Sequence, residues 1–166
     1  MKRILPFVIL SVVLTSCLGQ VMGEYVRVGQ GIPSFSVTLS DGKKFVSKER
    51  RGKPCVIVFF NTKCGDCQRE LPEVQDVYNE FREQASFVCI SRNETADKVR
   101  AYWSARGLSL PYSPQTDRKV FSLFAEVGIP RVYVVDDSGI VRHVFVEKVS
   151  ARKLRKALLP LCQETE

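Results

Sequence analysis

The sequence has one histidine and one tryptophan among 166 residues, and its only closely spaced cysteine pair is Cys64 and Cys67. A zinc ribbon needs a second such pair, so that class of metal site is excluded. The apolar stretch Ile4–Leu14 is too short to span a bilayer. Internal repeats and low-complexity segments are also missing. We interpret the lone His143 as an ordinary strand residue rather than as a metal ligand or a base.

Acidic residues are the minority, 18 against 25 basic ones, which gives a net charge of +7. The basic residues gather in the segments 48–53 and 152–156. We interpret both segments as solvated faces, with weak attraction to anionic lipid headgroups as the second interpretation. Because aromatic and basic residues do not alternate, the charge does not indicate a nucleic-acid partner.

The N-terminus has the features of an export signal. Lys2 and Arg3 precede the apolar stretch, and Leu14-Thr15-Ser16-Cys17 follows, which resembles the bacterial lipobox. We therefore expect a lipoprotein signal peptide over residues 1–16, a lipidated tether over 17–30 and one domain over 31–166. Lipid on Cys17 would hold a monomer at the extracytoplasmic face of the bacterial cell envelope. An ordinary signal peptide or an uncleaved anchor is the alternative.

The order of the remaining patterns predicts an α/β domain. Alternating apolar residues around Asp41-Gly42 predict a hairpin over 35–47, and apolar runs predict buried strands over 55–61 and 86–91. Helical spacing follows the first run to about residue 84, with Pro72 inside it. Further expected elements are a helix capped by Asn93, a short extended piece over 110–114, a helix from Asp117 to Val127, a hairpin over 131–146 and a C-terminal helix capped by Ser150.

Cys64-Gly65-Asp66-Cys67 stands where the first buried strand meets the helix that follows it. The unpaired N–H groups and the dipole at a helix N-terminus favour an anion. The thiolate is the reactive form of cysteine, so this position makes Cys64 a nucleophile. The two-residue spacing brings the sulfurs within one helical turn. A structural disulfide is the alternative interpretation.

Three motifs together resemble the thioredoxin superfamily, in particular membrane-tethered oxidoreductases of the TlpA/ResA type. They are Cys64-Gly65-Asp66-Cys67, the adjoining segment Gln68–Pro72, and Gly128-Ile129-Pro130. The resemblance covers residues 31–161. It implies a thioredoxin fold, a mixed central sheet flanked by helices, here with an N-terminal β-hairpin extension. It also implies a thiol–disulfide oxidoreductase without a cofactor or a metal, which acts on the disulfides or thiols of exported proteins and exchanges electrons with a membrane-bound partner.

The same resemblance assigns roles to individual residues. Cys64 would attack a substrate disulfide, and Cys67 would resolve the mixed disulfide. Glu70 would shuttle the proton of Cys67, or it is simply an exposed glutamate near the helix start. Ile129 and Pro130 would form the substrate-binding loop, with a cis peptide bond before the proline.

The sequence departs from the family pattern at two positions. Family members usually carry tryptophan where Lys63 stands, and often threonine where Ile129 stands, with Arg131 close behind. We expect Lys63 and Arg131 to contact substrate and to stabilise the Cys64 thiolate, while Asp66 opposes them. A stabilised thiolate favours the reduced form and makes the pair more oxidising.

Three alternative functions would each require a different feature from the sequence or the fold. A thiol peroxidase of the peroxiredoxin type would need proline at Ile57 and threonine at Asn61, and the sequence has neither. A copper-binding assembly factor would separate its cysteines by three residues and add a distal histidine. A non-catalytic binding module would keep the fold without turnover.

Three cysteines remain outside the motif and the lipobox. Cys55 and Cys89 lie in apolar runs and are expected to be buried thiols, although a bridge between them is open. Cys162 lies near the polar C-terminus and is expected to be unimportant.

Overall fold

The computed structural model describes residues 23–49 and 52–163. Five strands form the central sheet in the order β5-β4-β3-β6-β7. Its strands are β3 Cys55–Phe60, β4 Ser86–Ser91, β5 Tyr112–Ser113, β6 Arg131–Val135 and β7 Val141–Val146. A separate hairpin joins β1 Ser36–Thr38 to β2 Lys44–Val46, and the α-helices are α1 Gly65–Phe81, α2 Ala96–Arg106 and α3 Ala151–Gln163. The expected mixed α/β architecture with an N-terminal hairpin is confirmed.

The sheet is mixed because it contains both parallel and antiparallel strand pairs. β3, β4 and β5 are parallel, whereas β6 is antiparallel to β3 and β7 is antiparallel to β6. Every residue of β3 is buried, which explains why its sequence is a continuous apolar run rather than an alternation. The antiparallel pairing of β6 with β3 brings the start of β6 beside the end of β3, and this pairing positions the site described below.

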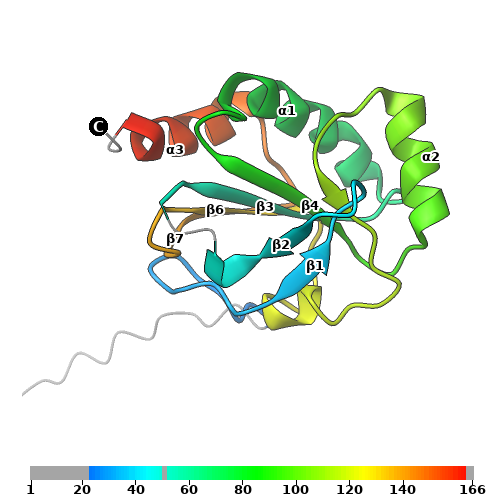
Figure 1. The fold of residues 1–166 in the computed structure, drawn as a ribbon, viewed down its shortest axis with the longest axis horizontal. Coiled ribbons are helices and arrows are strands. Elements are labelled where there is room, and N and C mark those ends of the chain that lie inside the picture. The colour runs from blue at the N-terminus through cyan, green and yellow to red at the C-terminus, as the bar shows by residue number, and fades with distance from the viewer. Residues whose placement is uncertain (1–22, 50–51, 164–166) are drawn as a thin grey trace, which may run out of the picture.

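Each face of the sheet has its own hydrophobic core. Figure 1 shows the helices α1 and α3 on one side of the sheet and the hairpin β1–β2 on the other. Leu71 of α1, Trp103 of α2 and Leu154 of α3 belong to the core on the first face. The hairpin β1–β2 and a short 3-10 turn over Phe121–Leu123 cover the second face, where six rings pack together. These rings are Phe35, Phe45, Phe59, Phe121, Phe124 and Tyr133.

The two apolar-run cysteines lie on opposite faces of the sheet. Cys89 packs in the core under the helices, and Cys55 packs in the core under the hairpin. In the parallel register Cys55 pairs with Ser86, three positions before Cys89. A bridge between the two sulfurs would have to pass through the sheet, so the structure excludes it.

Two expected elements differ from the structure. The helix expected from Asp117 to Val127 is only the 3-10 turn Phe121–Leu123. A longer helix does not form because residues 124–126 instead form backbone hydrogen bonds with residues 23–26, including a bridge between Glu24 and Ala125. The cap of α2 is Thr95, and Asn93 instead adopts a left-handed conformation with φ 61°.

The folded unit begins earlier than the sequence suggested. Of the expected tether over 17–30, the structure describes residues 23–30, and these lie on the domain. Glu24 forms a bridge with Ala125, Gly31 forms another with Ile140, and the Val26 side chain is buried. Cys17 and the expected signal peptide lie outside the described residues.

The hairpin turn between β6 and β7 is organised by one carboxylate. Asp136 Oδ1 accepts hydrogen bonds from the backbone N–H groups of Ser138 (3.0 Å) and Ile140 (2.8 Å), and Oδ2 pairs with Arg142 Nε (2.6 Å). Burial raises the pKa of Asp136, but the bonds from Ser138, Ile140 and Arg142 outweigh it and hold the pKa below its ordinary value.

We expect Asp136→Asn to lower the free energy of unfolding by about 1–2 kcal/mol, because the amide cannot accept all of these bonds. Since the folded-state pKa is depressed, the carboxylate stabilises the fold above its unfolded pKa, and this stability is lost as the pH falls below about 4. Urea unfolding from pH 7 to pH 3 should therefore show a shallower acid loss in the variant. Parallel curves for the two proteins would contradict this.

Candidate active site

Cys64 lies at the N-terminus of α1, directly after the turn that follows β3. Its backbone is extended (φ −78°, ψ 118°), and its sulfur accepts the N–H of Cys67 at 3.3 Å, so the side chain caps the helix. Cys64 is half-buried, whereas Cys67 is fully buried against the first core. In the described residues neither cysteine forms a disulfide. Cys64 is therefore the more accessible of the two cysteines, and Cys67 is sheltered in the core.

The turn before Cys64 is fixed by side chains from two other elements. The carboxylate of Glu94, which follows β4 and is only 5% exposed, accepts the N–H of Thr62 at 2.8 Å and also its hydroxyl. From α1, Gln68 Nε2 donates to the Thr62 carbonyl at 2.7 Å. Sequence reasoning missed Glu94. The sequence does show that Glu94 follows the apolar run of β4 closely, and β4 is parallel to β3.

The cis-proline loop faces the dithiol. The peptide bond between Ile129 and Pro130 is cis, as expected, and the Cys64 thiol donates to the Ile129 carbonyl at 3.6 Å. Pro130 is buried. This contact joins two segments that are 65 residues apart in the chain.

Burial, hydrogen bonds and a nearby charge shift the pKa of the buried Cys67 thiol in opposite directions. Burial raises its pKa well above the ordinary value, and the hydrogen bond with Cys64 adds to the rise. A backbone contact at Asn61 and the charge of Arg92 act in the opposite direction. Cys67 therefore rests as the protonated thiol and must lose a proton before it can act as a nucleophile.

Arg92 is a cation near the dithiol that the sequence analysis missed. It is half-buried after β4, and its guanidinium lies 5.1 Å from the ring centre of Phe121, with Arg118 at 5.6 Å from the same ring. Burial and Arg118 lower the pKa of Arg92, while Cys67 and Cys64 raise it. Only the tertiary pairing of β4 with β3 brings this arginine to the site.

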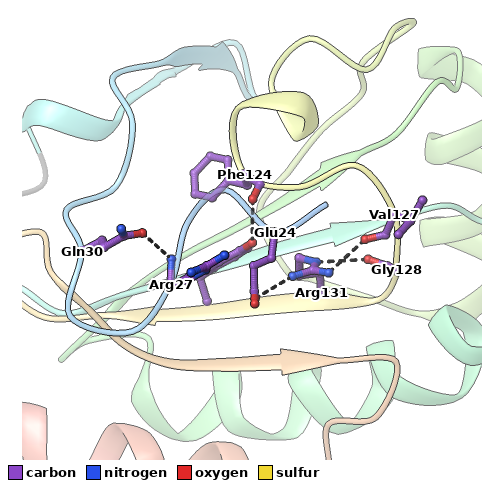
Figure 2. A network of polar contacts seen from close by, with 8 residues as sticks. Glu24, Arg27, Gln30, Phe124, Val127, Gly128 and Arg131 are labelled. Carbon is purple, nitrogen blue, oxygen red and sulfur yellow. Dashed lines mark hydrogen bonds and ion pairs between the residues drawn. The ribbon is translucent and has the colours of Figure 1, made fainter. Parts of the chain in front are cut away.

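The two basic residues expected at the dithiol lie in different places. Lys63 is exposed and immediately precedes Cys64, with its N–H bonded to Asn61 Oδ1 at 2.9 Å. Arg131 instead lies on the second face, because it is in register with Phe59, and its guanidinium pairs with Glu24 (Figure 2). Arg131 is therefore buried and ion-paired rather than an unpaired charge beside Cys64, and its expected contact with substrate remains a prediction.

Glu70 links α1 to the start of α3. Its Oε2 accepts the N–H of Val149 at 3.0 Å, and Glu73 Oε2 accepts the N–H of Ala151 at 2.7 Å. The N-terminal N–H groups of a helix have no partner within the helix, so Glu73 supplies an acceptor for the first residue of α3, while Glu70 binds the backbone just before that helix. Among the described residues, Glu70 forms this hydrogen bond with Val149, and the proton-shuttle role of Glu70 remains a prediction.

No group of three or more His, Cys, Asp or Glu side chains that could hold a metal ion occurs within residues 23–49 and 52–163. His143 is exposed on β7, with its ring stacked on Phe145.

A sequence profile of the AhpC/TSA family matches residues 28–144. The chain belongs to this family. Its relatives include the thiol-disulfide oxidoreductase ResA of Bacillus anthracis, 24% identical over 95% of this chain and 93% of the relative. The ResA of Bacillus subtilis (strain 168) is also 24% identical, over 71% of this chain and 66% of the relative.

Comparison with solved structures identifies the fold. A thiol:disulfide interchange protein of the thioredoxin family from Chlorobium tepidum TLS superposes with a TM-score of 0.71. It is 29% identical, and the match covers 82% of this chain and 98% of that one. The thioredoxin fold is thus confirmed for this AhpC/TSA member.

We expect Glu70→Ala to lower the free energy of unfolding by about 1 kcal/mol, because the N–H of Val149 loses its acceptor. Glu70→Gln keeps an amide oxygen at the same place and should retain most of the stability. Urea unfolding of both variants tests this, with Glu73→Ala and Glu73→Gln as the matched pair for Ala151. If Glu70→Gln lost as much stability as Glu70→Ala, the negative charge rather than the hydrogen bond would be the important feature.

Proposed function

We propose that this thiol–disulfide oxidoreductase exchanges disulfides with exported proteins at the bacterial cell envelope, through Cys64 and Cys67. The observation that carries the proposal is the placement of the Cys64 sulfur. It caps α1, and it faces the carbonyl before the cis-proline. The relatives named for thiol–disulfide chemistry support the same activity.

The reaction proceeds in two exchanges. The Cys64 thiolate attacks one sulfur of a substrate disulfide, and the other substrate sulfur leaves as a thiolate that takes up a proton. Cys67 then loses its proton and attacks the Cys64 sulfur, which releases the second substrate thiol and forms the Cys64–Cys67 disulfide. Two electrons pass from the dithiol to the substrate. The reverse sequence oxidises a substrate dithiol.

Electrostatics favour the reduced state of the pair. Arg92 places positive charge near the sulfurs, Lys63 directly precedes Cys64 in the chain, and Asp66 is paired with Arg69. We therefore expect the Cys64–Cys67 couple to have a reduction potential above that of thioredoxin, about −270 mV. Equilibration with glutathione and dithiothreitol buffers measures it. A lower value would contradict the charge argument and would mark the protein as a strong reductant that needs a membrane electron donor.

Single-cysteine variants test the order of attack. Cys67→Ser should accumulate a mixed disulfide between Cys64 and a peptide disulfide, because no second thiol resolves it, and mass spectrometry would detect the adduct. Cys64→Ser should form no adduct and should lose exchange to the background rate, since Cys67 is buried and protonated. Exchange that persists in Cys64→Ser would contradict the role of Cys64 as the attacking thiol. An unaltered protein that exchanges no disulfide would favour the non-catalytic binding module instead.

The proposed membrane attachment depends on lipid at Cys17. None of the described helices is long and apolar enough to cross a bilayer. Cys17→Ser should move the protein from the membrane fraction to the soluble fraction and should abolish labelling by a fatty-acid analogue. Cys162→Ser, which leaves the lipobox intact, is the control. Unchanged labelling of Cys17→Ser would contradict the lipobox assignment.

A further inference from the structure

Arg131 and Glu24 form an ion pair on the face of the sheet away from the dithiol. Arg131 Nη1 lies 3.0 Å from Glu24 Oε1, and the two side chains are only 5% and 19% exposed. The remaining guanidinium nitrogens donate to carbonyls. Nη2 donates to Val127 at 3.0 Å and Nε to Gly128 at 3.3 Å (Figure 2). These two carbonyls belong to the residues that lead directly into Ile129 and the cis-proline.

A buried pair of this kind is a poor way to gain stability. Withdrawal of two charges from water costs free energy that their attraction often fails to recover, and an apolar pair of similar volume often serves stability equally well. The planar guanidinium offers something else, because it presents several donors in a fixed geometry. Here it joins one carboxylate to two successive carbonyls, so it fixes the conformation of the loop backbone.

The same loop is also held from the N-terminal side. The Tyr25 N–H donates to the Phe124 carbonyl at 2.9 Å, and the Glu126 N–H donates to the Gly23 carbonyl at 2.7 Å. Residues 23–26 therefore run beside residues 124–126, and the Glu24 side chain completes the guanidinium contacts. The segment before the cis-proline is held by main-chain and side-chain bonds from the same N-terminal stretch.

Gly128 shows how closely the arginine packs on this loop. Its φ is +83°, and a Cβ added there would lie 3.1 Å from Arg131 Nη2 and 2.9 Å from Val146 Cγ1. Only glycine suits both this conformation and this space. The loop geometry thus depends on a glycine, an arginine and a distant carboxylate together.

We propose that Glu24 and Arg131 are positioning residues that hold the Ile129–Pro130 loop in the geometry that binds an extended peptide next to Cys64. The inference rests on the proposed function and extends it to the substrate class. A peptide disulfide, which must lie along the loop, depends on the pair, whereas a small disulfide that touches only the Cys64 sulfur does not.

The test compares two disulfides with the full-length protein in its reduced form. One is a peptide disulfide and the other is the neutral 2-hydroxyethyl disulfide, and thiol release is followed as each concentration is varied. We expect Glu24→Gln and Arg131→Lys to raise the half-saturating concentration of the peptide by at least about threefold, because small misplacements of a binding loop have large effects. The ratio of peptide rate to small-disulfide rate should fall by the same factor.

Arg131→Lys is informative because lysine keeps the charge pair but lacks the fixed set of donors that reaches both carbonyls. The double variant Glu24→Gln/Arg131→Met should bind peptide no worse than Arg131→Met alone, since Glu24 acts through the arginine. Arg100→Lys alters an exposed arginine–aspartate pair on α2 and is the matched control. Thermal unfolding of every variant shows that each is folded at the assay temperature.

A fall in the rate ratio for Glu24→Gln and Arg131→Lys, with none for Arg100→Lys, supports the proposal. Equal loss for both disulfides would overturn it, as would lower thermal stability with an unchanged ratio, or strictly additive effects in the double variant. If the unaltered protein failed to reduce 2-hydroxyethyl disulfide at all, the proposed function itself would fail. That outcome is distinct from an unchanged ratio in an active protein.

Discussion

The antiparallel pairing of β6 with β3 is the constraint on which the site depends. β3 ends beside the start of β6, since Phe59 is in register with Arg131. The turn after β3 carries Cys64, and the loop before β6 carries the cis-proline, so one ladder of backbone hydrogen bonds places both at the same edge of the sheet. The contact between Cys64 and the Ile129 carbonyl follows from this register. A shift by one residue would turn every side chain of β6 to the other face.

The same pairing explains why Arg131 does not lie beside Cys64. Successive side chains of a strand point to opposite faces, so closeness in sequence to Pro130 does not bring Arg131 to the sulfurs. It reaches the core under the hairpin, where a buried guanidinium requires a partner. Glu24, from a segment expected to be a tether, supplies it. The N-terminal stretch thereby becomes part of the support for the active-site loop.

Charge near the dithiol also comes from tertiary contacts. Lys63 adjoins Cys64 in the chain, but Arg92 comes from the end of the neighbouring parallel strand, as does Glu94, which holds the turn before the cysteine. Parallel strands end at the same edge of a sheet, so the residues that follow β3 and β4 meet there. The site is therefore built from three chain segments, and only one of them contains the cysteine pair.

The sequence by itself determined the features that depend on local patterns. The strands β4, β6 and β7 and the helix after the cysteine pair are set by apolar periodicity and by turn residues, whereas the cis bond at Pro130 is expected only from the family resemblance. Only the tertiary structure decided the partners. The 3-10 turn replaced a longer helix because residues 124–126 pair with the N-terminal stretch. Glu70 binds the backbone just before α3, and Arg131 binds Glu24. A polar side chain bonds to the partners that the packed elements bring within hydrogen-bonding distance, and the local sequence does not specify which elements pack together.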